Sequence, residues 1–515
     1  MNATIDVFIV WSGAEVTGRN VAALRESGLV DTVTVMADSE PDAGFAAGNA
    51  CRWVQVESPH SSEAIEAIED LVVCHQLHND RCILYVDTPG LVQWGYHGLH
   101  RMLQVLLMSR AGMVFADHYR VIDGKKLNHP VIDYQFGSLR DDFDFGPVVM
   151  FQTPAFLRAV DFSPVQGYRY AGFYAKRLAI SRLQEMGNNV IVHIPEYLYT
   201  AWQDTLRTSG ERIYDYCRPE HREAQLEMED ACTTHLRCID AYLHHDGLYI
   251  KKFDYSNPKD RFNPYRAEEP FPVEMTVVIP VLNRERVIRD AIRSVLMQEA
   301  TFAYNLIVVD NHSTDGTSQA IDEFVGDSRV IHLIPERTDL GIGGCWSLAA
   351  HDERCGRFLI GLDSDDVYAT PLVLQSMVDK FYETGAAMVC GAYRVTDFDL
   401  NVVPPGVVDH KEWTLENGHN NLFHVNGVGG PRAFYTPVLR AIDIPDTCYG
   451  EDYALGLMIS GAYRVGRVFE VMTLARRWSD NTDADISIEQ ENANNYYKDS
   501  LRTWELNYRM SILKE

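Results

Sequence analysis

The sequence is short of basic residues and lacks any pattern of paired cysteines. It has 46 Lys and Arg against 73 Asp and Glu, which gives a formal net charge of −27 at pH 7. A surface of that sign repels nucleic acid and anionic lipid, so we expect neither as a partner. The ten cysteines show neither CxxC pairs nor the Cys/His spacing of a zinc site. This predicts buried, reduced thiols in a cytoplasmic protein.

Long apolar runs are also missing. No window approaches the roughly 18 uninterrupted apolar residues of a membrane span. The N-terminal stretch MNATIDVFIVWSG has no basic region, and its apolar run is too short for a signal peptide. We therefore expect no integral membrane segment. At 515 residues the chain is too long for one hydrophobic core, so two domains are predicted.

The second half of the chain alternates apolar strands with amphipathic helices. Strand-like runs lie at 276–282, 305–311, 329–336 and 357–363, and helix-like segments lie between them. Continuous apolar strands separated by helices predict a parallel sheet that is covered on both faces. Ligands of such sheets bind at the carboxyl ends of the strands.

The first half follows the same plan, which suggests an internal duplication. RCILYVDTPG resembles RFLIGLDSDD, and YAGFYAKRLAIS resembles YGEDYALGLMIS, in the same order along the chain. We predict an α/β protein with two tandem domains joined by a helical connector. The predicted parts are 1–207, the connector and linker 208–270, the second domain 271–485, and a C-terminal helix 486–515. That helix has an aromatic face, which we expect to pack on its own domain or on a sister subunit of a homo-oligomer.

Carboxylates follow the apolar run at the end of FLIGLDSDDVYAT. Asp363 and Asp365 are two residues apart, so in an extended chain both side chains point the same way. Hard divalent cations take oxygen ligands, and Mg²⁺ is usually held by one or two carboxylates and substrate phosphates. We expect a divalent metal here, Mn²⁺ or Mg²⁺, and such a cation would let an acidic protein bind an anionic ligand. The alternative is a solvated acidic turn.

Polar residues also follow the neighbouring strands. Asp310 and Asn311 close the strand 305–311 and are well placed to meet a nucleobase edge or ribose hydroxyls. The turn PVLNRE, which contains Arg284, precedes a helix N-terminus, a place that favours an anion. Ser313, Thr314 and Asp315 are expected only to cap the next helix.

Two further segments carry candidate site residues. Glu451 and Asp452 follow Gly450 at a loop-to-helix junction, where a carboxylate can act as a general base. One of the two acids is alternatively a helix-start residue. The glycine-rich run before Arg432 permits close approach to a ligand, and Arg432 would neutralise phosphate or orient a sugar hydroxyl. A glycine-rich turn without a ligand is the alternative.

Taken in order, these motifs resemble the family-2 glycosyltransferases, which have the GT-A fold. The resemblance covers roughly 275–478 and rests on PVLNRE, VDNHSTDGT, the D-x-D of DSDD and the late ED pair. It implies two tandem GT-A-like, Rossmann-like domains. It also implies an inverting, metal-dependent hexosyltransferase-type enzyme that moves a sugar from a UDP-sugar to a hydroxyl of a glycan or glycoconjugate, in polysaccharide biosynthesis.

The resemblance also implies roles for individual residues. Asp365 would be the principal metal ligand, Asp363 would contact ribose or metal, and Asp452 would be the base with Glu451 beside it. The remaining donor-binding candidates are Pro280, Asn283, Arg284, Glu285, Asp310, Asn311, Ser364, Gly430, Arg432 and Arg477.

The chain departs from the family pattern at two positions. Asn311 stands where many members carry Asp. The segment ARRWSDNTD, which includes Asp480, offers no His as a third metal ligand, so Arg477 is expected to face the phosphates.

The N-terminal copy has lost the motifs of the C-terminal one. Asp87 matches Asp363, but Thr88, Pro89 and Gly90 follow it, and Gly-Phe at 172–173 replaces the ED pair. We predict a non-catalytic domain for acceptor binding or assembly; a metal-independent active site is the alternative. For the whole chain, a sugar-1-phosphate nucleotidyltransferase and a non-catalytic sugar-binding scaffold also stay open. The first lacks its glycine-rich loop after the strand 276–282, and the second is disfavoured by the intact DSDD and GEDY.

Overall fold

The computed structural model describes residues 4–513 except 42–43, 76–79, 161, 163–166, 184–189, 203–220, 245–269, 412, 415 and 479–485. The predicted domain boundary at 207, residues 245–269 of the predicted connector and linker, and Asp480 lie outside the described residues. The chain forms two compact units. The N-terminal unit contains the described residues of 1–208, 220–242 and 486–515, and the C-terminal unit contains those of 243–485.

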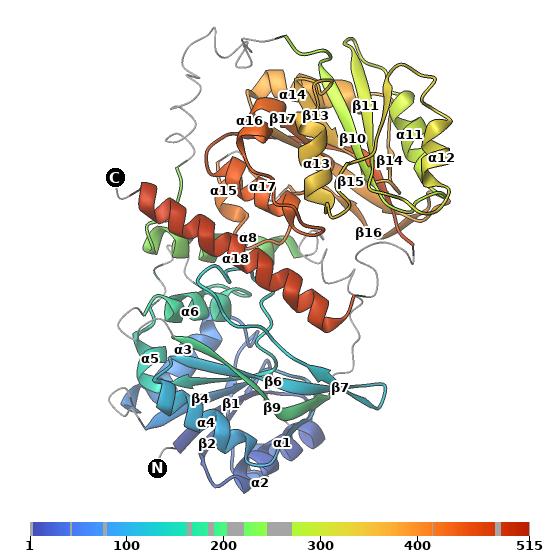
Figure 1. Cartoon of the computed structure of the whole chain (residues 1–515). Coiled ribbons are helices and arrows are strands. Elements are labelled where there is room, and N and C mark those ends of the chain that lie inside the picture. The colour runs from blue at the N-terminus through green and yellow to red at the C-terminus, as the bar shows by residue number, and fades with distance from the viewer. Residues whose placement is uncertain are drawn as a thin grey trace. The chain divides into compact units, whose positions relative to one another are not determined.

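The N-terminal unit is a nine-stranded mixed sheet with helices (Figure 1). Its elements are β1 (Thr4–Val10), α1 (Ala14–Glu26), β2 (Val30–Ala37), α2 (Phe45–Gly48), β3 (Arg52–Gln55), α3 (Ser62–Val72), β4 (Arg81–Val86), β5 (Val92–Trp94), α4 (Gly98–Ser109), β6 (Met113–Ile122), β7 (Lys125–His129), β8 (Val148–Gln152), α5 (Thr153–Arg158), α6 (Gly172–Ser181), β9 (Ile191–Trp202), α8 (Arg222–Cys238) and α18 (Ile488–Ile512), with a 3₁₀ turn at Val73–His75.

The C-terminal unit is built on the same plan. Its elements are β10 (Met275–Val281), α11 (Ile288–Leu296), β11 (Tyr304–Asp310), α12 (Thr317–Asp322), β12 (Val330–Leu333), α13 (Ile342–His351), β13 (Phe358–Gly361), β14 (Val367–Tyr368), α14 (Val373–Thr384), β15 (Met388–Thr396), β16 (Val402–Val408), α15 (Gly418–Asn421), β17 (Arg432–Tyr435), α16 (Thr436–Ala441), α17 (Glu451–Ser460) and β18 (Val465–Arg476).

The two sheets have the same strand order. The N-terminal order is β3-β2-β1-β4-β8-β6-β9-β5 with β7 paired to β6, and the C-terminal order is β12-β11-β10-β13-β17-β15-β18-β14 with β16 paired to β15. Each strand of one unit thus has a counterpart in the other. The predicted α/β class with two tandem domains is confirmed, and the shared topology supports the duplication.

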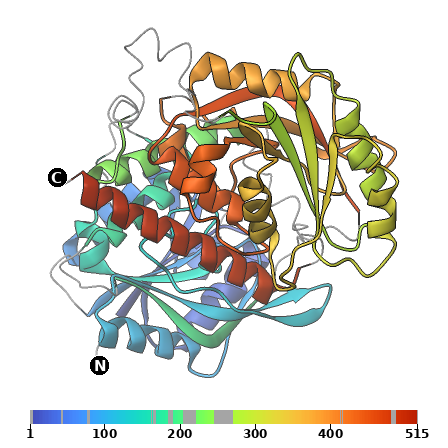
Figure 2. The same ribbon diagram turned by 45° about the horizontal axis from the view of Figure 1, so that its top comes forward.

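The apolar strands are buried on both faces. In the N-terminal unit Ile5, Val7 and Ile9 pack with α1 and α4, whereas Phe8, which points to the other face, packs with α3, α5 and α6. Figure 2 shows the same arrangement in a turned view. This two-sided cover explains why the strands are continuously apolar in the sequence.

Helix α18 belongs to the N-terminal unit, although it follows the C-terminal one in the chain. Asp499 is fully buried, accepts a hydrogen bond from Ser138 Oγ at 2.8 Å and pairs with Arg502 at 2.8 Å. A Cβ on Gly137 would lie 2.2 Å from the Thr503 backbone nitrogen, so the loop and the helix backbone are in direct contact. The helix therefore packs on the domain of the first half of the chain, where its buried Asp499 has its partners.

Neither membrane spans nor disulfides occur in the described part of the chain. No helix among the described residues is long and apolar enough to cross a bilayer. The described cysteines are all free thiols and most are buried, although Cys74, Cys238 and Cys448 are exposed.

Candidate active site

The parallel strands of the C-terminal unit bring the predicted carboxylates to one edge of the sheet. Strands β10, β11 and β13 are parallel neighbours, and Val281 at the end of β10 pairs with Asp310 at the end of β11. Asp363 and Asp365 follow β13, the strand on the other side of β10. Three carboxyl ends of strands thus meet, as the sequence predicted.

The DSDD turn concentrates negative charge. Asp363 is exposed, Ser364 and Asp366 are half-buried, and Asp365 is 9% exposed. Burial, together with the charges of Asp363 and Asp365, holds the pKa of Asp366 well above its usual range. The turn therefore has a local excess of negative charge that a cation would offset.

The segment after β18 holds this turn. Trp478 Nε1 donates to Asp365 Oδ2 at 3.1 Å, and the Arg476 backbone N–H donates to Asp366 Oδ1 at 2.9 Å. The Arg476 guanidinium also donates to the Asp365 carbonyl and pairs with Asp290 at 3.0 Å. Sequence reasoning did not assign Arg476 or Trp478 to the site, although ARRW stood where a metal-ligating His was sought.

The ring of Trp478 also orders two arginines of the first loop. The guanidinium carbons of Arg284 and Arg286 lie 5.9 and 5.7 Å from its centroid. Trp478 therefore connects the metal-ligand candidate Asp365 with cations of the loop after β10.

Arg432 of β17 joins the ED pair to the DSDD turn. Arg432 Nη1 lies 2.8 Å from Asp452 Oδ2, and it donates to the Gly429 carbonyl at 2.7 Å. Although burial opposes the cation, the surrounding carboxylates raise its pKa, and these are Asp452, Asp363 and Glu451. Arg432 therefore lies close enough to both acids of the ED pair and to Asp363 for their charges to act on it.

The two acids of the ED pair have different environments. Burial and the neighbouring charge of Asp452 raise the pKa of Glu451 to about 7, and Glu451 Oε2 is buried with no hydrogen-bond partner among the described residues. Asp452 Oδ1 accepts from the Tyr453 backbone N–H at 2.7 Å, and its other oxygen is ion-paired. Such a difference between paired carboxylates is typical of acid–base sites.

Of the nucleotide-pocket candidates, Asp310 is enclosed and Asn311 has an unused acceptor. Asp310 is 0% exposed; burial opposes its charge, but hydrogen bonds from Ser318, Ser313 and His332 lower its pKa. Its carboxylate therefore organises the following loop. Asn311 Nδ2 donates to the Leu340 carbonyl at 2.8 Å, whereas Asn311 Oδ1 is buried without a partner among the described residues.

The side chains of the PVLNRE turn brace the neighbouring loop. Asn283 Oδ1 accepts from the Thr314 N–H at 2.7 Å, and Glu285 Oε2 accepts from the Gly316 N–H at 3.2 Å. Asn283 has a positive φ of 54°, a conformation that Asn tolerates better than most residues. These contacts tie the turn to the loop after β11.

The other candidates lie at the borders of the site. Pro280 is half-buried near the end of β10, and Gly430 is half-buried just before β17. The Arg477 backbone N–H donates to the Thr396 carbonyl at 2.7 Å, which fixes the backbone of Arg477 directly after β18.

No metal cage of the protein's own occurs in the described ranges. Within them, no group of three or more His, Cys, Asp or Glu side chains is placed to hold a metal ion. Mg²⁺-type sites commonly use one or two carboxylates and complete the shell with phosphate and water. The all-oxygen pair Asp363 and Asp365, in an excess of negative charge, fits that kind of site.

Comparison with known proteins adds the family. Residues 276–434 match the model of "Glycosyl transferase family 2". The C-terminal unit is a family 2 glycosyltransferase domain. The matched segment contains the DSDD turn and Arg432, and it confirms the prediction of a glycosyltransferase enzyme. A search of curated proteins finds no match.

Solved structures similar to this glycosyltransferase include three from different sources. S. aureus TarS 1–349 in complex with UDP-GlcNAc has 18% identity and a TM-score of 0.37, over 44% of this chain and 66% of that one. Mannosyltransferase PcManGT of Pyrobaculum calidifontis, with GDP-Man and Mn²⁺, has 15% identity and a TM-score of 0.31, over 48% and 76%. Glucosyl-3-phosphoglycerate synthase of Mycobacterium tuberculosis, with Mn²⁺, UDP and glucosyl-3-phosphoglycerate, has 19% identity and a TM-score of 0.31, over 46% and 80%. This chain thus spans just under two thirds of the TarS fragment.

Proposed function

We propose that the C-terminal unit is an inverting, metal-dependent glycosyltransferase that moves a sugar from a UDP-sugar to a hydroxyl of a glycan or glycoconjugate during polysaccharide biosynthesis. One observation carries the proposal. Arg432 forms an ion pair with Asp452 at 2.8 Å, and the charge of Asp363 also acts on Arg432, which supports a site bordered by both the base candidate and the D-x-D turn.

The donor nucleotide would lie at the carboxyl ends of β10 and β11. The unpartnered acceptor Asn311 Oδ1 suits a ring N–H such as that of uracil, because a buried polar atom without a partner is costly. Asp310 is a positioning residue, since its enclosed carboxylate holds the loop that carries Ser313. Pro280 would border the base, and Ser364 and Gly430 would border the sugar and phosphates.

The diphosphate needs positive charge. Asp365 and Asp363 would hold Mg²⁺ or Mn²⁺, which when bound supplies Lewis-acid stabilisation of charge on a diphosphate. The chain's own cations, Arg284 beside Trp478 and Arg477, would face the phosphates. Trp478 orients the Asp365 carboxylate through its Nε1.

The acceptor hydroxyl needs a base on the face opposite the departing nucleotide. Asp452 is assigned this role because its pairing with Arg432 orients a carboxylate at the start of α17. With a pKa near 7, Glu451 is partly protonated at neutral pH and is suited to donate a hydrogen bond to the acceptor or to Asp452.

Donor turnover by variants tests this scheme. The full chain is assayed for UDP release from a panel of UDP-sugars with Mn²⁺, and UDP binding is measured on the same samples. We expect Asp365→Ala to lose metal-dependent UDP binding, and Asp452→Asn to bind UDP but lose turnover. Asp379→Ala, which removes an exposed carboxylate of α14, is the control. Absence of any wild-type turnover would refute the enzyme, and wild-type activity of both site variants would refute the residue assignments.

A further inference from the structure

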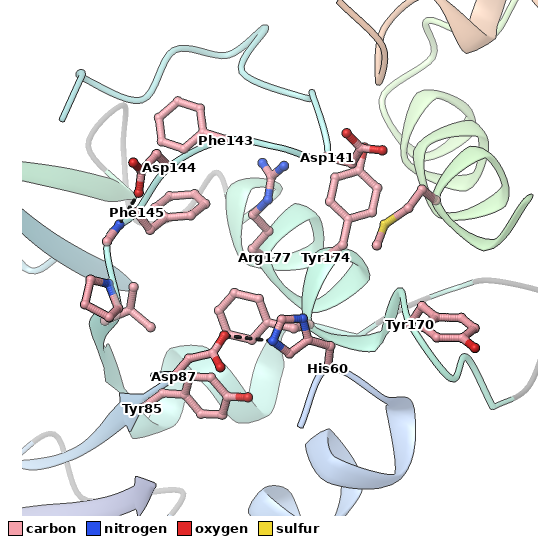
Figure 3. Close-up of a pocket in the computed structure, with 15 residues that line it drawn as sticks. His60, Tyr85, Asp87, Asp141, Phe143, Asp144, Phe145, Tyr170, Tyr174 and Arg177 are labelled. Carbon is pink, nitrogen blue, oxygen red and sulfur yellow. Dashed lines mark hydrogen bonds and ion pairs between the residues drawn. The ribbon is translucent and has the colours of Figure 1, made fainter. Parts of the chain in front are cut away.

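The N-terminal unit has a cavity where its copy of the active site would lie. It has a volume of about 220 Å³ and is lined by β4, the loop 141–147, α6 and the segment before α3 (Figure 3). Ile83 and Leu359 each lie opposite a phenylalanine of the next strand, so Asp87 and Asp363, four residues later, are equivalent. The N-terminal cavity is thus the counterpart of the candidate catalytic site.

At two positions where the C-terminal copy carries an acidic residue, the N-terminal copy has a glycine whose side-chain space is occupied by the backbone of another segment. A Cβ on Gly172, the first residue of α6 as Glu451 is of α17, would lie 2.3 Å from the backbone of Ser61 and Ser62. A Cβ on Gly90, the counterpart of Asp366, would lie 1.6 Å from the Trp202 carbonyl oxygen. No acidic side chain fits at either position, so the counterparts of Glu451 and Asp366 cannot be restored here by substitution alone.

The same rearrangement creates a new polar pair. The segment that abuts Gly172 carries His60, whose Nε2 lies 2.7 Å from Asp87 Oδ2. The two side chains are 47% and 36% exposed, and Figure 3 shows them side by side at the floor of the cavity. An imidazole that donates and a carboxylate that accepts match two neighbouring hydroxyl groups.

Aromatic rings form the walls of the cavity. Tyr85 and Phe173 stack with centroids 5.1 Å apart, and Phe143 and Phe145 lie together at 4.5 Å on another side. Flat apolar walls with a few convergent polar groups are typical of small-molecule sites, and they suit the C–H faces of a sugar ring. The volume is below the roughly 300–1,000 Å³ of sites for drug-sized ligands, so it suits a single ring and not a nucleotide.

The charges of the cavity disfavour an anion. Asp87, Asp141 and Asp144 contribute carboxylates. The cation Arg177 is 3% exposed, donates to the Ser138 carbonyl at 2.8 Å and lies over the Tyr174 ring. Its guanidinium is therefore already paired within the protein. The counterpart of Arg432 is the apolar Val149, because each lies two residues before the phenylalanine that is paired with Leu359 or Ile83.

The cavity is also held in shape from outside. Loop residue Arg140, close to Asp141, pairs with Asp142 at 2.7 Å and lies 3.5 Å from Asp499 of α18. Glu227 of α8 accepts backbone hydrogen bonds from Tyr170 at 2.7 Å and Ala171 at 3.1 Å, which caps the start of α6. A preformed site loses little conformational entropy on binding.

From these observations we propose that the N-terminal cavity is a non-catalytic binding site for one neutral sugar residue of a glycan, held by the Asp87–His60 pair and the Tyr85–Phe173 wall. The choice of a sugar among neutral polyols rests on the proposed function of the C-terminal unit. The enzyme would then have a second carbohydrate-binding site, which requires no metal ion.

Binding of simple glycosides to the full chain tests this site. The probes are methyl glycosides of glucose, galactose, mannose and N-acetylglucosamine and their disaccharides. They are titrated by calorimetry and saturation-transfer NMR, first without nucleotide and then with UDP and Mn²⁺ in excess. We expect saturable binding of at least one probe. Asp87→Asn and Phe173→Ala should each raise its Kd about tenfold or more, because the first removes an acceptor of the polar pair and the second removes part of the aromatic wall.

The register-equivalent substitution Asp363→Asn is the matched control. It should weaken UDP binding and leave the glycoside Kd within about twofold, whereas Asp87→Asn should leave UDP binding unchanged. Circular dichroism and thermal melts verify folding of each variant. Failure of every probe to bind, a wild-type glycoside Kd in both N-terminal variants, or displacement of the glycoside by UDP would each overturn the site. Loss of UDP binding by the wild type would instead count against the proposed function alone.

Discussion

The ion pair between Arg432 and Asp452 gives the sharpest quantitative test of the candidate site. Its two side chains are 23% and 28% exposed, and Arg432 also faces Asp363 and Glu451. Exposed pairs contribute about 0–1 kcal/mol, and removing one partner of a buried pair costs about 3–5 kcal/mol. For this half-buried pair we expect a coupling free energy of about 2 kcal/mol.

The two single substitutions should not be equal. Arg432→Gln leaves three carboxylates without their common cation, so it should cost about 3 kcal/mol of unfolding free energy. Asp452→Asn removes one of the carboxylates around Arg432 and also removes the repulsion between Asp452 and Glu451, so it should lower the unfolding free energy by about 1 kcal/mol or less. The order of the two effects follows from the number of carboxylates that face Arg432.

A double-mutant cycle in urea measures both quantities. Hydrogen exchange of peptides from β17 and α17 reports on the C-terminal unit by itself, since a chain of two units need not unfold in one step. The control cycle uses Arg337 and Asp339, whose side chains lie 2.7 Å apart but are 68% and 67% exposed, and there we expect no measurable coupling. A coupling below about 0.5 kcal/mol between Arg432 and Asp452, or a larger cost for Asp452→Asn than for Arg432→Gln, would refute the arrangement.

Three further predictions concern other parts of the molecule. The pKa of Glu451 is raised to about 7 in the folded state, so its contribution to stability is fully present below its unfolded pKa and is lost as the pH rises through 7. Glu451→Gln should therefore be more stable than the wild type at pH 8, by up to about 3 kcal/mol, but not at pH 4. Urea titrations at both pH values measure this difference. Trp478→Phe keeps the ring beside Arg284 but removes the donor to Asp365, so calorimetry should find UDP–Mn²⁺ binding weakened roughly tenfold, and unchanged binding would contradict a link between Trp478 and the metal ligands. Asp499→Asn leaves the buried Arg502 without its carboxylate and should destabilise the N-terminal unit by about 3 kcal/mol or more in hydrogen exchange, whereas Asp379→Asn on an exposed helix face should have no effect.

The sequence was most informative where a pattern is local. Apolar strands and the carboxylates at their ends predicted that β10, β11 and β13 are parallel and that Asp310 and Asp363 lie at the same edge of the sheet, because parallel strands have their carboxyl ends at one edge. The sheet as a whole is mixed, since β17 is antiparallel to β13. The duplication was visible as ordered pairs of segments, and the matching strand orders of the two sheets support it.

Contacts between distant segments were not predictable in the same way. Nothing around Trp478 indicates that its Nε1 reaches Asp365, 113 residues earlier. The sequence shows Gly172 at the position that corresponds to Glu451, so the loss of this acid from the N-terminal copy was predictable. It does not show that the Ser61 backbone lies against Gly172, so the His60–Asp87 pair was not predicted. Asp310 was expected to meet a ligand, yet its complete burial depends on the loop that folds over it.

The position of α18 has a consequence for how this chain is made. Translation completes residues 4–202 long before Asp499 and Arg502 leave the ribosome. Ser138 and the loop at Gly137 therefore lack their contacts with α18 until the last segment of the chain has been made. The first domain to be synthesised is thus the last to be completed, after the C-terminal glycosyltransferase domain already has all of its strands. A fragment that ends before residue 486 lacks a piece of its N-terminal core, and expression of that domain by itself requires α18 to be supplied, for example by grafting it behind α8.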